Sequence, residues 1–557
     1  MKKHFTWIVV FLSLVINHTL LKQQSFRQEI PFVNNIRYSD FLVQKWFLSV
    51  VAISVLFVWV FVNKRKILNS LLRRKVYLLA IMFITLIIHL SSFQRWFEFD
   101  DYRLIGHHFA VSGTDNYNSM GAVNNPYYGY AFAYLVVGWF GDKFVLYNAT
   151  GLIVLILIGL TIFFFSNLIQ KNKFVSLLTA LIFTTSTTYF RQILQMHEFI
   201  GDTFPLLLFA AAIYFVIKRF YPGAIIFAAA SMEFGLSREH FIGVPLFLLV
   251  LFFAHQKLIM RKKIVVALIF PLMTFAYLPV FLNFPPQIIN RSDWLSNWPQ
   301  AVRLLDVIFG ITTPHLLAYP VFNFFNFILH NFFYSDEGIL AYFSPIFGFV
   351  FVLTMSALVI LKRENYLAIK LLVVGMSIVV GSVVFQTLSG IRLEHNLSAL
   401  HRQYLDLLPS APTSYGLPAA LGISILFLGF SQIMRLRIFY LFAIVTVVIN
   451  SMGFIVADFE WVRQVSFPQR VVNKQLEEII PYDGKVKTVF TPHPSELLVR
   501  YVSYFYQLYR IKDPLYFTND PDEFIKLVNK YKPDKNSTFM LELDKKTHVV
   551  FDRSNLL

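Results

Sequence analysis

The sequence predicts an α-helical polytopic membrane protein with about 13 transmembrane helices and a small α/β domain outside the membrane. Of its 557 residues, 56% are hydrophobic, whereas soluble domains contain roughly 45–50% apolar residues. The apolar residues form runs long enough to cross a bilayer, and short basic clusters separate these runs. After residue 456 the chain changes to the mixed apolar and polar pattern of a soluble domain.

The predicted spans are apolar runs of about 17 to 25 residues, the length that a helix needs to cross the hydrocarbon core. The first run follows Met1-Lys2-Lys3 and has the look of a signal peptide, but no small-residue cleavage site follows it. We therefore expect this segment to be retained as the first span. The spans are placed at 5–21, 42–62, 76–92, 144–168, 174–190, 203–217, 222–236, 241–255, 264–283, 340–361, 367–388, 413–431 and 437–456.

Basic residues cluster in every second loop. The clusters are Lys64-Arg65-Lys66 with Arg73-Arg74-Lys75, Lys171 with Lys173, Lys218-Arg219, Arg261-Lys262-Lys263, Lys362-Arg363, and Arg435 with Arg437. The positive-inside rule places these loops and the N-terminus in the cytoplasm, and an odd number of spans then places the C-terminal domain outside. The formal charge of +17 is explained by these loops, so nucleic acid is not an expected partner.

The chain contains no cysteine, which excludes disulfides, thiolate metal sites and cysteine nucleophiles. This composition fits a prokaryotic source, and we expect a multi-pass protein of the plasma membrane. The acids before residue 456, other than Glu364, lie at predicted outer positions. Because acids contribute little to topology, their crowding on one side suggests that polar chemistry takes place there.

The sequence divides into a transmembrane module, 1–456, and an extracytoplasmic α/β domain, 457–557. The module has two long outer segments, 93–143 and 284–339. In the C-terminal domain, strands are expected over 486–490, 539–543 and 548–551, and helices over 495–509 and from Pro521 to Tyr531.

Asp100 and Asp101 stand directly after the third predicted span. A carboxylate is costly in hydrocarbon, so this pair should lie where the chain emerges into water or a polar cavity. Adjacent carboxylates raise one another's pKa, which suits one of them to act as general base for an acceptor hydroxyl. The alternative is an ordinary solvated loop.

Three elements in this first outer segment resemble the GT-C superfamily of integral membrane glycosyltransferases. Asp100-Asp101, Pro126-Tyr127-Tyr128 and Phe140-Gly141-Asp142 follow in the order of that family's acidic pair, Pro-aromatic helix start and Phe-Gly-Asp turn. The nearest branch is that of the protein O-mannosyltransferases and lipid A aminoarabinose transferases. Two features depart from the family pattern: Tyr147-Asn148 stand where an Arg is usual, and two extra spans precede the acidic pair.

Later outer turns carry further polar candidates. His197, Glu198 and Asp202 follow the fifth span, and either Glu198 or Asp202 matches the acid that the family has where the chain re-enters the membrane. His197 with Glu198 leaves a divalent cation possible, although two potential ligands are weak evidence for a metal. Arg238 and Glu239 break two apolar runs, and Arg238 suits a bidentate contact with a phosphate oxygen. The structural alternatives are a polar turn and an Arg–Glu pair at the interface.

The segment His401-Arg402-Gln403-Tyr404 resembles the family's Arg-Tyr motif, which precedes a Pro-marked span and meets the lipid phosphate. Gln403 separates Arg402 from Tyr404, which departs from that motif. Cationic and hydroxyl groups at the entrance of a span suit a phosphodiester leaving group. Anchoring of the span at the membrane interface is the alternative role.

The resemblance implies transfer of a sugar from a polyprenyl-phosphate donor to an acceptor hydroxyl on a protein, lipid or glycan. Asp100 would act as base with support from Asp101, while Arg402, with Arg238 or His401, would stabilise the departing lipid phosphate. A flippase or transporter for lipid-linked saccharides is one alternative, although no repeat is visible and the acids do not lie in mid-span. An O-antigen ligase or polymerase-like enzyme is the other.

Overall fold

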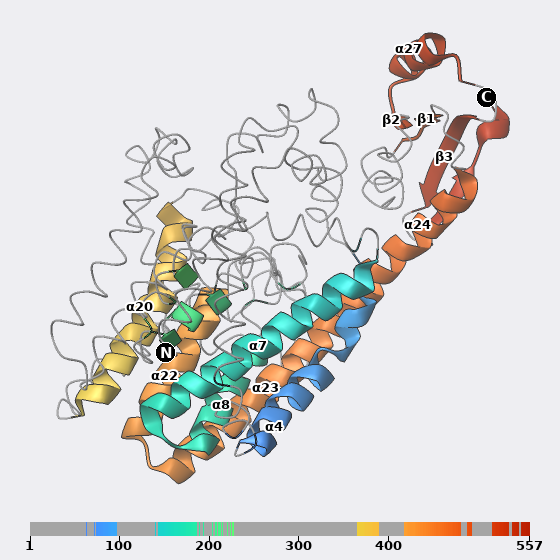
Figure 1. Cartoon of the computed structure of the whole chain (residues 1–557). Coiled ribbons are helices and arrows are strands. Elements are labelled where there is room, and N and C mark those ends of the chain that lie inside the picture. The colour runs from blue at the N-terminus through green and yellow to red at the C-terminus, as the bar shows by residue number, and fades with distance from the viewer. Residues whose placement is uncertain are drawn as a thin grey trace, which may run out of the picture.

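The structure is a computed structural model. It describes residues 74–96, 143–186, 365–388, 417–480, 487–492, 515–533, 537–544 and 547–556, together with isolated positions at 63–72, 140 and 189–227. These residues form a helical bundle that is joined by one long helix to a small sheet (Figure 1). The bundle helices are α4 (Lys75–Ile88), α7 (Phe144–Gln170), α8 (Lys173–Thr184), α20 (Tyr366–Leu388), α22 (Leu417–Ile433) and α23 (Leu436–Trp461).

Each of these helices lies over a predicted span, but two of them end earlier than expected. The expected span 76–92 is an α-helix only to Ile88, followed by the 3₁₀ helix η1 (Leu90–Gln94), and α8 ends at Thr184 instead of 190. Local side-chain bonds to the backbone compete with helix continuation at both ends. Ser92 Oγ donates to the carbonyl of His89, and Thr185 Oγ1 donates to that of Leu181 at 2.8 Å.

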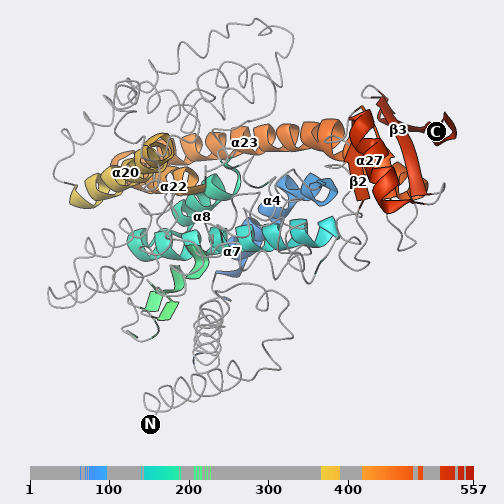
Figure 2. The same ribbon diagram turned by 90° about the horizontal axis from the view of Figure 1, so that it is seen from above.

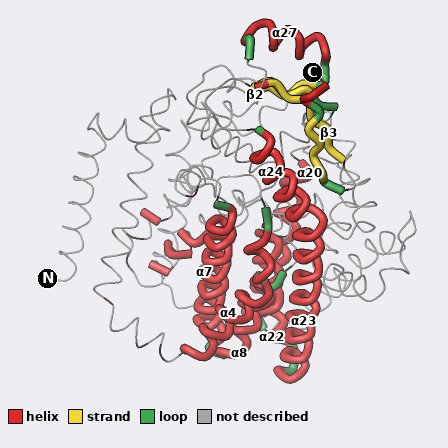
Figure 3. The backbone as a smooth tube through the Cα atoms, turned by 90° about the vertical axis from the view of Figure 1, so that its right-hand side faces the viewer, coloured by secondary structure: helices red, strands yellow, loops and turns green. Residues whose placement is uncertain are grey.

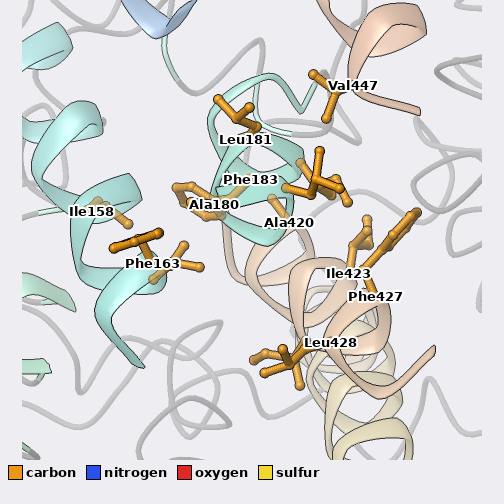
Figure 4. Close-up of a cluster of buried hydrophobic side chains, with 14 of the residues drawn as sticks. Ile158, Phe163, Ala180, Leu181, Phe183, Ala420, Ile423, Phe427, Leu428 and Val447 are labelled. Atoms are coloured by element: carbon orange, nitrogen blue, oxygen red, sulfur yellow. The ribbon is translucent and has the colours of Figure 1, made fainter. Parts of the chain in front are cut away.

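Helix α8 is the centre of the bundle. Every residue from Val175 to Thr184 is buried, and the helix contacts α4, α7, α22 and α23. A helix that is apolar on all sides is expected in such a position. Figure 4 shows Phe183 of α8 among apolar side chains from α7 and α22. Figure 3 shows the bundle helices from the side, running roughly parallel to one another below the sheet.

Helices α20 and α22 cross closely because glycines face the contact. An ideal Cβ on Gly375 would lie 2.8 Å from the carbonyl oxygen of Gly422 and 2.9 Å from the backbone nitrogen of Leu426. Small residues at such crossings allow backbones to approach and gain dispersion contacts. The two helices therefore touch through backbone atoms, and the rotation of a side chain cannot relieve a clash at this point.

We expect Gly375→Ala to destabilise the protein by about 1–3 kcal/mol, because the added methyl group must push the two backbones apart. This loss should appear although alanine gains about 1 kcal/mol over glycine in helix propensity. Thermal unfolding of the purified full-length chain measures it. Val373→Ala, on the exposed side of the same helix, is the control and should change stability by less than about 0.5 kcal/mol. Equal stability of Gly375→Ala and the parent would contradict the close crossing.

Each end of the bundle contains segments that the charge pattern predicts to lie on the same side of the membrane. At one end Asn172 Nδ2 donates to Tyr440 Oη at 3.1 Å, and Ser431 Oγ donates to Gln170 Oε1 at 2.9 Å. These residues flank the basic loops at Lys171 and Arg435. At the opposite end, Arg95 meets Asp458. Helices that follow one another directly along the chain, α7 with α8 and α22 with α23, therefore run in opposite directions, whereas α4, α8 and α23 lie side by side and run the same way.

The expected domain boundary at residue 457 falls inside a continuous helix. Helix α23 passes through the π-helical turn η6 (Val462–Ser466) into α24 (Phe467–Ile479), and Figure 2 shows this helix reaching from the bundle to the sheet. Apolarity decreases after residue 456, but helical spacing continues, because Pro468, Val472 and Leu476 recur at intervals of four and are buried. A fall in apolarity was therefore a poor marker for the end of this helix.

The C-terminal sheet has the strand order β2-β1-β3-β4. Its strands are β1 (Lys487–Phe490), β2 (Leu515–Thr518), β3 (Thr538–Asp544) and β4 (Val549–Asp552); β1 is parallel to β2 and β3, and β4 is antiparallel to β3. The strands expected over 486–490, 539–543 and 548–551 are present, β2 was not anticipated, and the helix expected over 495–509 lies outside the described residues. Helix α27 (Pro521–Tyr531) begins as predicted, with the Asp520 side chain accepting from the Asp522 backbone nitrogen at 2.9 Å.

Helices cover both faces of the sheet. Val472 and Leu476 of α24 pack on Val489, Leu541 and Val550, whereas Phe524 of α27 meets Phe490 on the other face with ring centroids 5.5 Å apart. Gln475 connects α24 to the edge strand: its Nε2 donates to the carbonyl of His548 at 2.9 Å, and its Oε1 accepts from Val550 N at 2.8 Å. The amide thus occupies the place of a further strand along part of β4.

Gln475→Ala should lower stability by about 1–2 kcal/mol, because it leaves a donor and an acceptor of β4 without partners. The neighbouring Lys474→Ala is a matched control, since Lys474 is 79% exposed and pairs with Glu478, one turn away. This control should change stability by less than about 0.5 kcal/mol. Hydrogen exchange at Val550, with thermal unfolding, distinguishes the two variants. Unchanged exchange at Val550 in Gln475→Ala would refute the contact.

Candidate functional site

The residues predicted to carry chemistry lie outside the described residues. They are Asp100, Asp101, His197, Glu198, Asp202, Arg238, Glu239, His401, Arg402 and Tyr404. The structure neither brings them together nor separates them. A buried polar cluster lies among the described residues that come just before the acidic pair in the sequence. We call it the Arg95–Asp458 cluster and define it as His89, Ser91, Ser92, Arg95, Asn148 and Asp458.

A buried ion pair forms the centre of this cluster. Arg95 Nε donates to Asp458 Oδ1, and Ser91 Oγ donates to the second carboxylate oxygen, Oδ2. The side chains of Arg95 and Asp458 are 1% and 0% exposed. Isolated charges are very costly to bury, so both oxygens of the carboxylate are satisfied by donors. The pair joins the chain just after η1 to the last part of α23.

Two further segments bond to the same arginine, and a second residue of α23 lies against it. Asn148 Nδ2 of α7 donates to the carbonyl of Arg95 at 3.0 Å, and Arg95 NH1 donates to the carbonyl of Ile193 at 3.4 Å. The guanidinium lies over the ring of Phe454, 5.6 Å from its centroid. Residues from three predicted outer positions, 95, 193 and 458, therefore meet at one end of the bundle.

His89 extends the cluster toward α8. Its Nε2 bonds with the carbonyl of Thr184 at 3.1 Å, and its ring lies 4.1 Å from that of Phe454. One turn earlier on α4, Thr85 Oγ1 donates to Thr184 Oγ1 at 3.1 Å. The polar end of α4 is thus bonded to both α8 and α23, which explains why the charged pair is held in one arrangement.

A small cavity adjoins the cluster, lined in part by His89, Arg95, Tyr147 and Asn148. The space in it for the centres of water molecules is about 10 Å³, the room that about one water needs. His89 Nδ1 is buried and makes no hydrogen bond to any of the described residues. The cavity therefore suits a bridging water, and a sugar ring does not fit into it.

The cluster can hold segments of the chain in position, but its charged groups are not available to react with a substrate. Asp458 is engaged on both oxygens and Arg95 is enclosed, so neither group is offered to a substrate in this arrangement. Among the described residues, no group of three or more His, Cys, Asp or Glu side chains is placed to hold a metal ion. The possible cation site at His197 and Glu198 lies outside the described residues.

Sequence reasoning missed Arg95 and Asp458 because it assigned them to an outer loop and to the C-terminal domain. The available signal was their place at the ends of apolar runs, since an ionisable residue at such a point usually has a partner. Asn148 was noted only as a departure from the family's Arg. In the structure it bonds to the backbone of Arg95.

Helix α7, with 27 residues, is long and apolar enough to span a bilayer; the apolar runs in the other described helices are shorter. A single helix of this kind is weak evidence, because core helices of soluble proteins share its length and composition. Comparison of the chain with models of protein families gives no match, and comparison with curated proteins and with solved structures gives none either.

Proposed function

We propose that the chain is a GT-C type membrane glycosyltransferase that moves a sugar from a polyprenyl-phosphate donor to an acceptor hydroxyl on the extracytoplasmic face. The observation that carries the proposal is the place of the Arg95–Asp458 cluster. It lies at the end of an apolar bundle where three predicted outer segments converge, and Arg95 precedes the acidic pair Asp100-Asp101 by five residues. At most about 17 Å of extended chain separates the two.

An exposed apolar band supports the membrane location. On α7 exposed apolar side chains run from Val145 to Leu168, and on α23 they run from Leu436 to Phe459. Each run covers roughly 35 Å of helix at about 1.5 Å per residue, close to the thickness of a bilayer's hydrocarbon core. Soluble monomers rarely expose apolar surface on this scale. The cluster is at the edge of this band, since Asp458 adjoins Phe459.

The place of the cluster at the edge of the apolar band fits a reaction at the membrane interface. A polyprenyl phosphate holds its phosphate at the membrane interface, and an embedded enzyme avoids extracting the chain at about 0.8 kcal/mol per CH₂. In the proposed step, Asp100 takes the proton of the acceptor hydroxyl while its oxygen attacks the anomeric carbon. The bond from that carbon to the phosphate oxygen breaks, and the lipid phosphate leaves with the electron pair. Arg402, with Arg238 or His401, stabilises its charge, and Tyr404 donates to it.

Helix α7 lacks the interruption that a transporter commonly has at its binding site. Transporters commonly bind substrate at discontinuous helices near the midplane, whereas α7 is continuous over 27 residues and contains no charged residue. The ion pair is at the end of the bundle instead of its middle. The proposal therefore places polar chemistry at the membrane surface.

Mass analysis of glycans and lipids tests the proposal. Cells that lack the protein should lose one glycosylated product and accumulate its polyprenyl-phosphate sugar, and the wild-type chain should restore both. Membranes that contain the chain should then transfer the sugar from that isolated lipid to the unmodified acceptor. Unchanged glycans and lipids in the deficient cells would overturn the proposal. Accumulation of donor on the cytoplasmic side alone would favour the flippase.

A further inference from the structure

The helix from Leu436 to Ile479 is fixed at both of its ends. At the bundle, Asp458 bonds to Arg95 and Ser91, and Phe454 lies against His89 and Arg95. At the sheet, Gln475 bonds to the backbone of β4 and Leu476 packs in the apolar core. A further contact lies between them, where Arg470 Cζ is 5.8 Å from the ring centroid of Phe144 at the start of α7.

The π-helical turn Val462–Ser466 lies between these two attachments. A π turn contains one residue more than an α turn, so it rotates all that follows by roughly 100° relative to a regular helix of 3.6 residues per turn. Its position has a local cause. Pro468 has no N–H, and its ring would collide with the carbonyl four residues earlier, at Gln464, inside the π turn. Widening the helix at this point relieves that collision.

The rotation makes the two buried faces compatible. In a regular α-helix, Asp458 and Leu476 are 18 residues apart and would point in about the same direction. In the structure Asp458 points into the bundle, whereas Leu476 points into the sheet, which lies beyond the end of the bundle. The extra residue in the turn therefore sets the angle between the face that enters the bundle and the face that carries the sheet.

We propose that α23, η6 and α24 act as a rigid strut and that the π turn sets its register, so that the C-terminal sheet is held in one orientation about 25 Å beyond the Arg95–Asp458 cluster. The 25 Å corresponds to the 17 residues between Asp458 and Gln475. The inference is independent of the proposed reaction, because it uses only contacts within the chain. A ligand bound to the sheet would be presented to the polar end of the bundle in a single orientation.

Distance measurements between spin labels test the strut, and the chain offers clean label sites because it contains no cysteine. Cysteines replace Lys143, at the start of α7, and Lys526, on α27, both exposed. The full-length protein in lipid nanodiscs should give one narrow distance distribution. A broad or bimodal distribution would show that the sheet moves relative to the bundle and would overturn the proposal.

Two variants of the labelled protein test the register. Deletion of Gln464 combined with Pro468→Ala restores a regular helix and should keep the mean distance within the width of the parent distribution. Insertion of one alanine after Gln464 adds about 100° of rotation and should move the mean distance by more than that width. Hydrogen exchange at Val550 shows whether the sheet stays folded on α24: both variants should keep its protection, because Gln475 and Val550 both follow the turn. A shift of equal size in both variants, or in neither, would refute the role of the π turn.

Discussion

Asp458→Asn should destabilise the protein by about 3–5 kcal/mol, the cost that follows when one partner of a buried ion pair is removed. The loss is large because Arg95 is 1% exposed and would keep its charge without a neutralising carboxylate. Ser91 would also lose a charged acceptor. Thermal and denaturant unfolding of the full-length chain in detergent measures the change.

The double variant Arg95→Met/Asp458→Leu distinguishes the charge from the packing. Buried ion pairs can be replaced by apolar residues at little cost, so this variant should be closer to the parent than either single substitution. Glu478→Asn is the control, since it removes an exposed carboxylate that pairs with Lys474, and should cost less than about 0.5 kcal/mol. If Asp458→Asn behaved like this control, the ion pair would not hold the end of the bundle together.

Asp100→Asn should lower the rate of sugar transfer by about 10²–10⁴-fold, the usual contribution of a general base. The amide keeps the shape of the side chain but cannot accept the proton of the acceptor hydroxyl. The loss should appear in kcat, with little change in KM for the donor, because the donor phosphate is assigned to Arg402 and Arg238. Transfer from the isolated lipid donor in membranes, at matched protein levels, measures it.

Glu98→Gln is the matched control for this experiment, because it neutralises an acid two residues earlier in the same segment. The rate of sugar transfer by Glu98→Gln should stay within about a few-fold of the parent rate, as expected for a group that takes no part in the reaction. Near-normal transfer by Asp100→Asn would end the catalytic assignment. Equal losses in both variants would indicate that the charge of the segment matters, and not one base.

The sequence predicted the helices well where apolarity alone determines them. Helix α7 begins at its expected residue, Phe144, because a continuous apolar run has no competing signal. The ends of the helices were harder to predict. His89 and Thr185 end α4 and α8 through hydrogen bonds that depend on neighbouring helices or on the local backbone. The continuation of α23 into α24 was missed because apolarity falls at residue 457 while the helical spacing persists.

The pairing of Arg95 with Asp458 could not be predicted from the sequence for a different reason. Arg95 and Asp458 are each unremarkable at the end of an apolar run, and only the packing of α4 beside α23 shows that they meet. The acidic pair was found because it is a local pattern, whereas an ion pair across 363 residues leaves no local pattern. The candidate catalytic residues stay predictions, because they lie outside the described residues.

The same separation of 363 residues has a consequence for synthesis in the cell. At about 5–20 residues per second, roughly 20–70 s pass between the emergence of Arg95 and that of Asp458 from the ribosome. During this interval Arg95, at the end of η1, is a cation whose buried partner does not yet exist. A chain that stops before α23 keeps this uncompensated charge, so the end of the bundle that contains Arg95 reaches its final packing only after the last bundle helix has been made.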